Sequence, residues 1–405
     1  MSDYVRRMTT PQRPIASRLG RLDVELTERC DNDCVHCCIN LPAGDSAARR
    51  REMTTEQVRE ILRQAADLGC LQVRFTGGEP LLRADFAELY VFARRLGLRV
   101  LVFTNARRIT PELADLWAEV PPLVDVEVSV YGMHAASYEA VSRAAGSFAQ
   151  FRRGVDLLLD RAVPFIVKGA LLPANRPEID EFATWAATMP GKTRLSAFSQ
   201  FFGLRNRRDD AVKNRLIRSV RATPEEGLAV LTRDPDAYRA EMTQFAARFV
   251  GAPGDRLFTC GAGHNVCVDA YGCAQPCMGL RAPEFAVDLL AGGEAAGGAA
   301  LAAALDGSQA LKGLRATDPE YLRRCARCFL KGLCEQCPAT SWSVHGTLDT
   351  PVEYLCEVAH AQARWLGWLR PRERAWDVAD WRPGVREVPQ AAGHLMIWQD
   401  GVDTR

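Results

Sequence analysis

The sequence lacks the features of membrane, secreted and nucleic-acid-binding proteins. No stretch approaches the roughly 18 consecutive apolar residues that a membrane-spanning helix needs. The N-terminus carries several arginines but no apolar segment typical of a secretory signal peptide. The net charge is only +1, which argues against a strongly electrostatic nucleic-acid or membrane partner. These absences predict a cytoplasmic protein, and its 405 residues are enough for two or three domains.

Cysteine, in contrast, is abundant. In a reducing compartment, 14 cysteines indicate metal or redox chemistry rather than disulfide bonds. The segment TERCDNDCVHCCIN at residues 27–40 spaces three of them as Cys30-x3-Cys34-x2-Cys37. A [4Fe–4S] cluster of ferredoxin type has four cysteine ligands, so three would leave one iron open. A zinc knuckle is the alternative, although the second ligand pair expected about 12–20 residues further on is missing.

A second motif follows one βα unit later. The apolar run at residues 71–75 leads directly into Thr76-Gly77-Gly78-Glu79-Pro80. Glycines at the end of a strand allow the backbone to approach a ligand closely. A simple glycine turn before a helix is the alternative, and the motif alone does not exclude it.

Apolar runs alternate with amphipathic helical patterns through the first half of the chain. Nearly continuous apolar strands are typical of parallel sheets buried on both faces. The predicted strands are 22–26, 71–75, 98–104, 124–130, 164–170 and 194–202, and the predicted helices are 54–68, 84–96, 111–118, 147–159 and 176–188. This is an α/β pattern of six βα units, which predicts a partial (β/α)6 TIM-like barrel with its chemistry in the loops after the strands.

The triad and the GGE motif together resemble the radical S-adenosylmethionine (SAM) enzymes. In that family SAM chelates the open iron of a [4Fe–4S] cluster, and an electron from the cluster cleaves it to a 5′-deoxyadenosyl radical. The resemblance implies that the triad holds the cluster and that SAM is contacted by Gly77, Gly78 and Glu79 at its amino group, by Ser129 and Arg143 at its ribose or carboxylate, and by His36 near the adenine. A solvated arginine and a serine that only satisfies backbone groups are the alternatives.

Nine further cysteines lie between residues 260 and 356, and all but Cys273 belong to one spaced group of eight. The run at residues 265–277 reads as a short hairpin that presents cysteines at both strand ends. A zinc ribbon is the alternative, because C-x2-C pairs are common zinc ligands. Cys38, Cys70 and Cys273 fall outside both groups. They read as ordinary buried thiols, although Cys38 could act as a hydrogen-atom donor.

The order of these eight cysteines resembles the SPASM extension of radical SAM enzymes, a small α+β domain with two auxiliary [4Fe–4S] clusters. The resemblance implies one cluster on Cys260, Cys267, Cys277 and Cys337 and another on Cys325, Cys328, Cys334 and Cys356. The last pair, Cys334-x2-Cys337, is one residue shorter than the family usually has. The ligand role of Cys337 is therefore the least supported.

The chain accordingly divides into five predicted segments. They are an N-terminal extension (1–20), the partial barrel (21–205), a helical bridge (206–259), the SPASM domain (260–360) and a tryptophan-rich tail (361–405). The bridge contains one long helical pattern at 224–250. About twenty residues precede the first strand, which leaves no room there for a fused leader-peptide-binding domain.

By the same resemblance, the predicted function is oxidative modification of a substrate, first of all a ribosomally synthesised peptide. Dehydrogenation of a small alcohol or aminoglycoside is the alternative, and a non-catalytic iron–sulfur or zinc scaffold or electron carrier is a third. Met278 stands where sulfatase-maturing relatives place an acidic residue, which disfavours that activity. Expected partners are an external electron donor such as flavodoxin or ferredoxin and a separate leader-peptide-binding protein, with a leaderless peptide substrate as the alternative to the latter. No catalytic acid–base residue is assigned.

Overall fold

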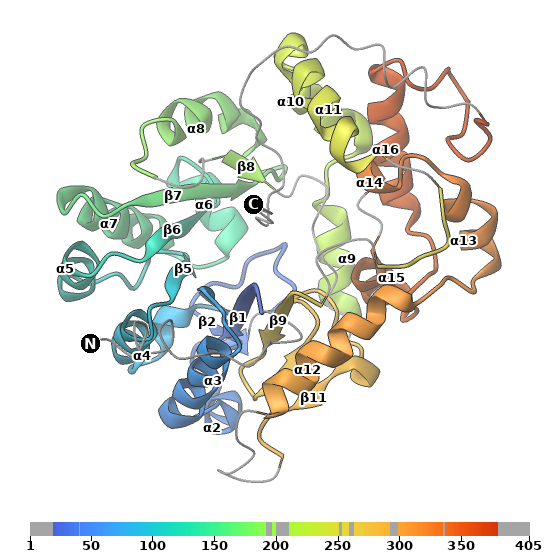
Figure 1. Cartoon of the computed structure of the whole chain (residues 1–405). Coiled ribbons are helices and arrows are strands. Elements are labelled where there is room, and N and C mark those ends of the chain that lie inside the picture. The colour runs from blue at the N-terminus through green and yellow to red at the C-terminus, as the bar shows by residue number, and fades with distance from the viewer. Residues whose placement is uncertain are drawn as a thin grey trace.

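The computed structural model describes residues 19–39, 41–191, 197–199, 210–250, 253–258, 263–291, 299–334 and 337–379 (Figure 1). Cys260, most of the predicted N-terminal extension and the tail from residue 380 lie outside these residues. No helix within the described ranges is both long and apolar enough to cross a membrane.

One large sheet organises the molecule. Its strands follow the order β11-β10-β9-β1-β4-β5-β6-β7-β8, and β2 and β3 form a separate small ladder. The strands are β1 (Arg21–Glu25), β2 (Arg29–Cys30), β3 (Leu41–Pro42), β4 (Gln72–Thr76), β5 (Arg99–Thr104), β6 (Leu123–Val130), β7 (Phe165–Ala170), β8 (Ala197–Ser199), β9 (Asn265–Val268), β10 (Cys273–Gln275) and β11 (Val287–Asp288). The run from β1 to β8 is parallel throughout, which confirms the predicted α/β sheet of βα units.

Helices cover the sheet and form a second group beside it (Figure 1). The helices are α2 (Ser46–Arg51), α3 (Thr55–Asp67), α4 (Phe86–Arg95), α5 (Pro111–Glu119), α6 (Ala135–Ser142), α7 (Ser147–Asp160), α8 (Ile179–Ala186), α9 (Ala211–Ser219), α10 (Pro224–Leu231), α11 (Pro235–Phe249), α12 (Ala299–Ala310), α13 (Pro319–Arg323), α14 (Lys331–Cys334), α15 (Pro338–His345) and α16 (Glu353–Trp365). Helices α10, α11, α14 and α16 pack together in the second group.

The helix α3 illustrates how the sequence sets these boundaries. Thr54 accepts a hydrogen bond from the Gln57 backbone N–H, and the Gln57 side chain accepts one from Thr54 N–H, so the predicted capping box is formed. Val58, Ile61, Leu62 and Ala65 repeat at helical spacing and are buried in the core beneath the sheet's apolar face. The helix ends at Asp67, with Leu68 as its C-cap before Gly69, which has φ +80°.

The predicted hairpin at residues 265–277 forms as β9 and β10, but it does not stand apart from the barrel. Strand β9 pairs in parallel with β1, so that Leu22 lies opposite Val266 and Val24 opposite Val268. The apolar side chains of both strands belong to the same buried core. The hairpin therefore extends the barrel sheet, a junction that the sequence did not predict.

Two helical predictions need correction. The single helix expected at 224–250 is two helices, because α11 begins anew at Pro235 after Asp234, whose side chain accepts a hydrogen bond from Ala237 N–H. Helix α6 was not predicted at all. His134 at its start makes no side-chain cap and Arg143 at its end has φ +51°, so neither terminus carries the usual sequence signal.

A buried ion pair lies on the inner side of the sheet. Asp23 of β1 accepts a hydrogen bond from Arg74 of β4 at 2.6 Å, and both side chains are almost fully buried. The Arg74 guanidinium also lies 4.9 Å from the ring centre of Phe103 on β5. This contact links three neighbouring parallel strands below the loops that follow them.

We expect Asp23→Ala to lower the free energy of unfolding by about 3–5 kcal/mol, because Arg74 would keep a buried charge without its carboxylate. The exposed pair between Arg161 and Asp115 provides the control. Asp115→Ala should cost less than about 1 kcal/mol. Urea unfolding of both variants measures the difference, and equal losses would contradict a structural role for the buried pair.

Candidate active site

The cysteine triad lies in the loop that leaves β1, and polar contacts fix the base of this loop. Strands β2 and β3 pair Arg29 with Leu41 and Cys30 with Pro42. The Arg29 guanidinium donates two hydrogen bonds to the Glu52 carboxylate, at 2.7 and 2.9 Å, and a third to the Ala43 carbonyl. The two ends of the loop are thus held together where it leaves and rejoins the barrel.

The three thiols of the triad share this short loop. The Cys37 N–H donates to the Cys34 carbonyl at 3.2 Å, and the Asn32 N–H lies 3.4 Å from Cys30 Sγ. Burial raises the pKa of Cys34 to about 12 and also raises the pKa values of Cys30 and Cys37. Buried thiols ionise when they coordinate a metal, since the metal supplies the missing positive charge. The donor set and its burial therefore fit a thiolate-bound iron–sulfur cluster.

Two cations from other elements hold the middle of the loop. Arg143, at the end of α6, donates to the Asp33 carbonyl at 2.8 Å and forms an ion pair with its carboxylate. Lys213 of α9 donates to the Cys34 carbonyl at 2.8 Å and lies 3.2 Å from Asp33 Oδ1. No motif points to Lys213, because it lies in the basic stretch at residues 205–221, which reads as a solvated helix face. The SAM contact of Arg143 remains a prediction.

The GGE motif packs directly against the same loop. Gly78 N–H donates to the Thr27 carbonyl at 2.7 Å, and Glu79 N–H donates to the Arg29 carbonyl at 2.8 Å. A Cβ added to Gly77, which has φ +132°, would lie 2.2 Å from Thr27 O, and one added to Gly78 would lie 2.3 Å from Arg29 O. Both glycines are required because backbone meets backbone here.

The Glu79 side chain is buried and turned toward the next strand. It accepts hydrogen bonds from Thr104 Oγ1 at 2.8 Å, from Asn105 N–H at 2.8 Å and from Leu81 N–H at 3.1 Å. Burial nevertheless raises the pKa of Glu79 to about 7. Asn105 also donates to Asp31 at 2.7 Å, which couples the ends of β4 and β5 to the triad loop. The contacts of the motif with SAM remain predictions.

Ser129 and His36 lie at the same mouth of the barrel. Ser129 is half-buried near the end of β6, on the opposite face from the buried Val128 and Val130. The His36 ring meets Tyr131 edge-on, with 5.6 Å between centroids, and burial lowers the pKa of His36 to about 4. The structure therefore brings the six residues expected to contact SAM to elements that surround the triad loop.

A second polar pair lies between the barrel and the added hairpin. Glu25, the last residue of β1, is fully buried, forms an ion pair with Arg281 and lies 3.9 Å from Cys267 Sγ. Burial raises the pKa of Glu25 and Arg281 opposes that rise. No sequence motif predicts this pair. The one signal is that two acidic residues, Asp23 and Glu25, alternate with apolar residues along β1.

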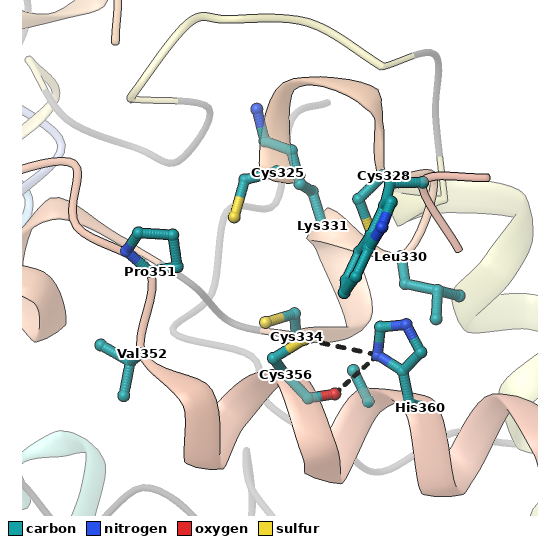
Figure 2. Close-up of a pocket in the computed structure, with 11 residues that line it drawn as sticks. Cys325, Cys328, Leu330, Lys331, Cys334, Pro351, Val352, Cys356 and His360 are labelled. Atoms are coloured by element: carbon teal, nitrogen blue, oxygen red, sulfur yellow. Dashed lines mark hydrogen bonds between the residues drawn. The ribbon is translucent and has the colours of Figure 1, made fainter. Parts of the chain in front are cut away.

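Four of the eight downstream cysteines line one pocket. Figure 2 shows Cys325, Cys328, Cys334 and Cys356 around the same hollow. They come from the turn before α14, from α14 itself and from α16. Four thiols that face one apolar pocket fit an iron–sulfur cluster, and they are the four cysteines expected to form the second auxiliary set.

The cysteines expected to form the first auxiliary set are only partly described. Cys267 is buried on β9, Cys277 is exposed beyond β10, and their electrostatic interaction places them near each other. Cys337 is the N-cap residue of α15, and its sulfur lies 3.3 Å from Thr340 Oγ1. It does not line the pocket that contains Cys334. Cys260 lies outside the described residues.

Three cysteines belong neither to the triad nor to either auxiliary set. Cys70 is buried in the barrel core, with its sulfur 3.0 Å from the Gln72 carbonyl, and Cys273 begins β10. Cys38 is half-buried beside Cys37. In the part of the chain that the structure describes, no three His, Cys, Asp or Glu side chains form a group that could hold a single metal ion, whereas the cysteines of a [4Fe–4S] cluster bind different irons.

Comparison with known proteins identifies the class. The model of the radical SAM superfamily matches residues 24–186. The PqqA peptide cyclase of Gluconobacter oxydans (strain 621H) is 30% identical over 269 residues, which cover 63% of this chain and 72% of the relative. The chain belongs to the radical SAM superfamily, and membership implies a [4Fe–4S] cluster and SAM.

Two further relatives match a smaller share of their own length. Mycofactocin maturase MftC of Mycolicibacterium smegmatis is 31% identical over 261 residues, or 62% of each chain. The PqqA peptide cyclase of Xanthomonas euvesicatoria pv. vesicatoria is 33% identical over 187 residues, or 45% of this chain and 49% of the relative. The chain thus spans about half of the length of this Xanthomonas relative.

Solved structures share the fold at low sequence identity. The structure "Native anSMEcpe with bound AdoMet" has a TM-score of 0.60 at 14% identity and covers 85% of this chain and 96% of that one. Streptococcus suis SuiB bound to S-adenosylmethionine has a TM-score of 0.57 at 15% identity and covers 84% and 75%. The likeness confirms the predicted architecture of a partial barrel.

We expect Gly78→Ala to lower the free energy of unfolding by about 1–3 kcal/mol, because its Cβ would push the backbone carbonyl of Arg29 away. SAM affinity, measured by calorimetry on the reconstituted protein, should fall as the triad loop shifts. Gly44→Ala is the matched control in the same loop, because an added Cβ there meets nothing within 4 Å. That variant should stay within about 0.5 kcal/mol of the wild type, and similar losses in both would refute the close-packing argument.

Proposed function

We propose that this chain is a radical SAM enzyme of SPASM type that oxidatively modifies a ribosomally synthesised peptide. The observation that carries the proposal is the close backbone contact between the triad loop and the GGE motif, which holds one buried and two half-buried thiols beside the residues predicted to contact SAM. The names of the relatives support the peptide substrate, since they are a peptide cyclase and a mycofactocin maturase. A structural neighbour, SuiB, is described in complex with the precursor peptide SuiA.

In this proposal, Cys30, Cys34 and Cys37 hold the SAM-binding cluster. Cluster and SAM together supply hydrogen-atom abstraction from an unactivated carbon, which no acid–base side chain achieves. The protein supplies positioning and exclusion of water. Arg143 and Lys213 hold the loop at Asp33 and Cys34, and the electrostatic interaction among the three thiols places them near one another.

Two auxiliary clusters complete the proposal and give the removed electron a route away from the product. One is held by Cys325, Cys328, Cys334 and Cys356, and their shared pocket supports that assignment. The other is held by Cys260, Cys267, Cys277 and Cys337. The pairing of β9 with β1 supports this assignment. Cys267 lies on β9, and β1 is the strand that leads into the triad loop. An external electron donor and a separate leader-binding protein complete the reaction.

The metal content tests the cluster assignment. After anaerobic reconstitution we expect about twelve irons per chain, at four in each of three cubane clusters, and about eight in the variant with Cys30, Cys34 and Cys37 changed to Ala. The variant Cys325→Ala/Cys328→Ala should lose the same number from a different cluster. If the protein instead bound zinc and almost no iron, the radical mechanism would be wrong, and the result would favour a non-catalytic scaffold.

The chemistry is tested separately from the metal. With SAM and a strong reductant, we expect the wild type to release 5′-deoxyadenosine and the triad variant to release none. Short peptides encoded next to the gene, incubated with the enzyme and their leader-binding partner, should then lose the mass of two hydrogen atoms. If SAM is cleaved and a small alcohol or aminoglycoside is oxidised instead, the peptide assignment is wrong while the radical mechanism stands.

A further inference from the structure

The pocket of the second cysteine set contains a histidine that neither the motifs nor the proposed mechanism uses. His360 lies on α16, one turn after Cys356, and its side chain is 1% exposed. Figure 2 shows its ring beside Cys356, with both Nδ1 contacts drawn. Nδ1 lies 2.8 Å from the Cys356 carbonyl oxygen and 3.5 Å from the Cys356 sulfur.

The partners of His360 decide which ring nitrogen carries the proton. The backbone N–H of Ala375 lies 3.2 Å from Nε2, and because an amide N–H can only donate, Nε2 must accept. The proton of the neutral ring is therefore on Nδ1. The carbonyl of Cys356 can only accept, so this N–H points toward Cys356 and is shared between its oxygen and its sulfur.

The segment after α16 covers His360 and Cys356 and shields them from solvent. It folds back so that Ala375, fully buried, reaches His360, and the Trp376 ring lies edge-on to the imidazole with 5.2 Å between centroids. Trp376 itself lines the pocket. The Arg324 guanidinium lies 4.8 Å from the Trp376 ring centre, and its Nη2 lies 3.6 Å from Cys356 Sγ. Two N–H donors thus face one sulfur inside a covered pocket.

We propose that His360 is a positioning residue for the auxiliary cluster on this cysteine set, with its Nδ1–H fixing the Cys356 sulfur and stabilising the reduced cluster. The inference rests on the proposed function, since it assumes a cluster on these four cysteines. Hydrogen bonds to ligand sulfurs and burial are among the factors that set the reduction potential of iron–sulfur clusters. A donor stabilises the more negatively charged sulfur of the reduced state, so its loss lowers the potential.

A matched pair of substitutions separates the two ring nitrogens. His360→Asn keeps an N–H near the position of Nδ1, whereas His360→Gln keeps an acceptor near Nε2 for Ala375 and loses the donor beside the sulfur. Both are made in the Cys30/Cys34/Cys37→Ala background, so that only auxiliary clusters remain. Comparison with Cys325→Ala/Cys328→Ala in that background identifies the paramagnetic resonance signal that belongs to this set.

We expect His360→Gln to reduce the equilibrium constant for reduction about tenfold, which for a one-electron couple is a potential about 59 mV more negative. His360→Asn should restore most of that loss, with the iron content unchanged in both. Equal potentials in the two variants would overturn the inference, because a purely structural histidine does not distinguish them. Absence of auxiliary iron in the parent protein would instead refute the proposed function.

A measurement without any substitution at His360 covers the case in which both variants fail to fold. Labelling the histidines with ¹⁵N should replace a weak ¹⁴N coupling with a ¹⁵N coupling in the signal of this cluster in the triad variant. The chain has six histidines, and among those that the structure describes His360 is the one that lines this pocket. A signal without that coupling would show that no imidazole N–H reaches the cluster sulfur.

Discussion

The close approach of two backbone segments, at Thr27 to Arg29 and at Gly77 to Glu79, is the constraint on which the site depends. Two hydrogen bonds join them, and neither glycine can carry a side chain without moving a carbonyl. Because the first segment leads directly to Cys30, this contact fixes where the triad loop starts. The inward Glu79 carboxylate then extends the same contact to the end of β5.

A second constraint joins the two cysteine-rich parts of the chain. Strand β9 adds to β1 in parallel, and Arg281 pairs with the buried Glu25 at the end of β1. A parallel neighbour needs no local turn, so strands from sequence positions more than 200 residues apart can share one core. The triad loop and the hairpin with Cys267 therefore leave adjacent strands.

Much of the barrel followed from sequence patterns, and the failures have physical causes. The apolar runs, the capping box at Thr54 and the glycine motif after β4 depend on neighbours close in sequence, and the structure confirms them. Helix α6 was missed because its caps use no side-chain signal. Asp234 and Pro235 are a typical helix start, but the helical pattern continues on both sides of them and therefore predicted a single helix.

Motif spacing and hydrophobic period are local properties of the chain, so the sequence alone predicts the family and the parallel sheet. Other contacts exist only in the folded chain: Lys213 and Arg143 hold the triad loop, Glu25 meets Arg281, and His360 lies between Cys356 and Ala375. These contacts join residues on different elements or depend on how a later segment folds back. No periodicity encodes them, since each is fixed by packing and by the need to satisfy buried polar groups.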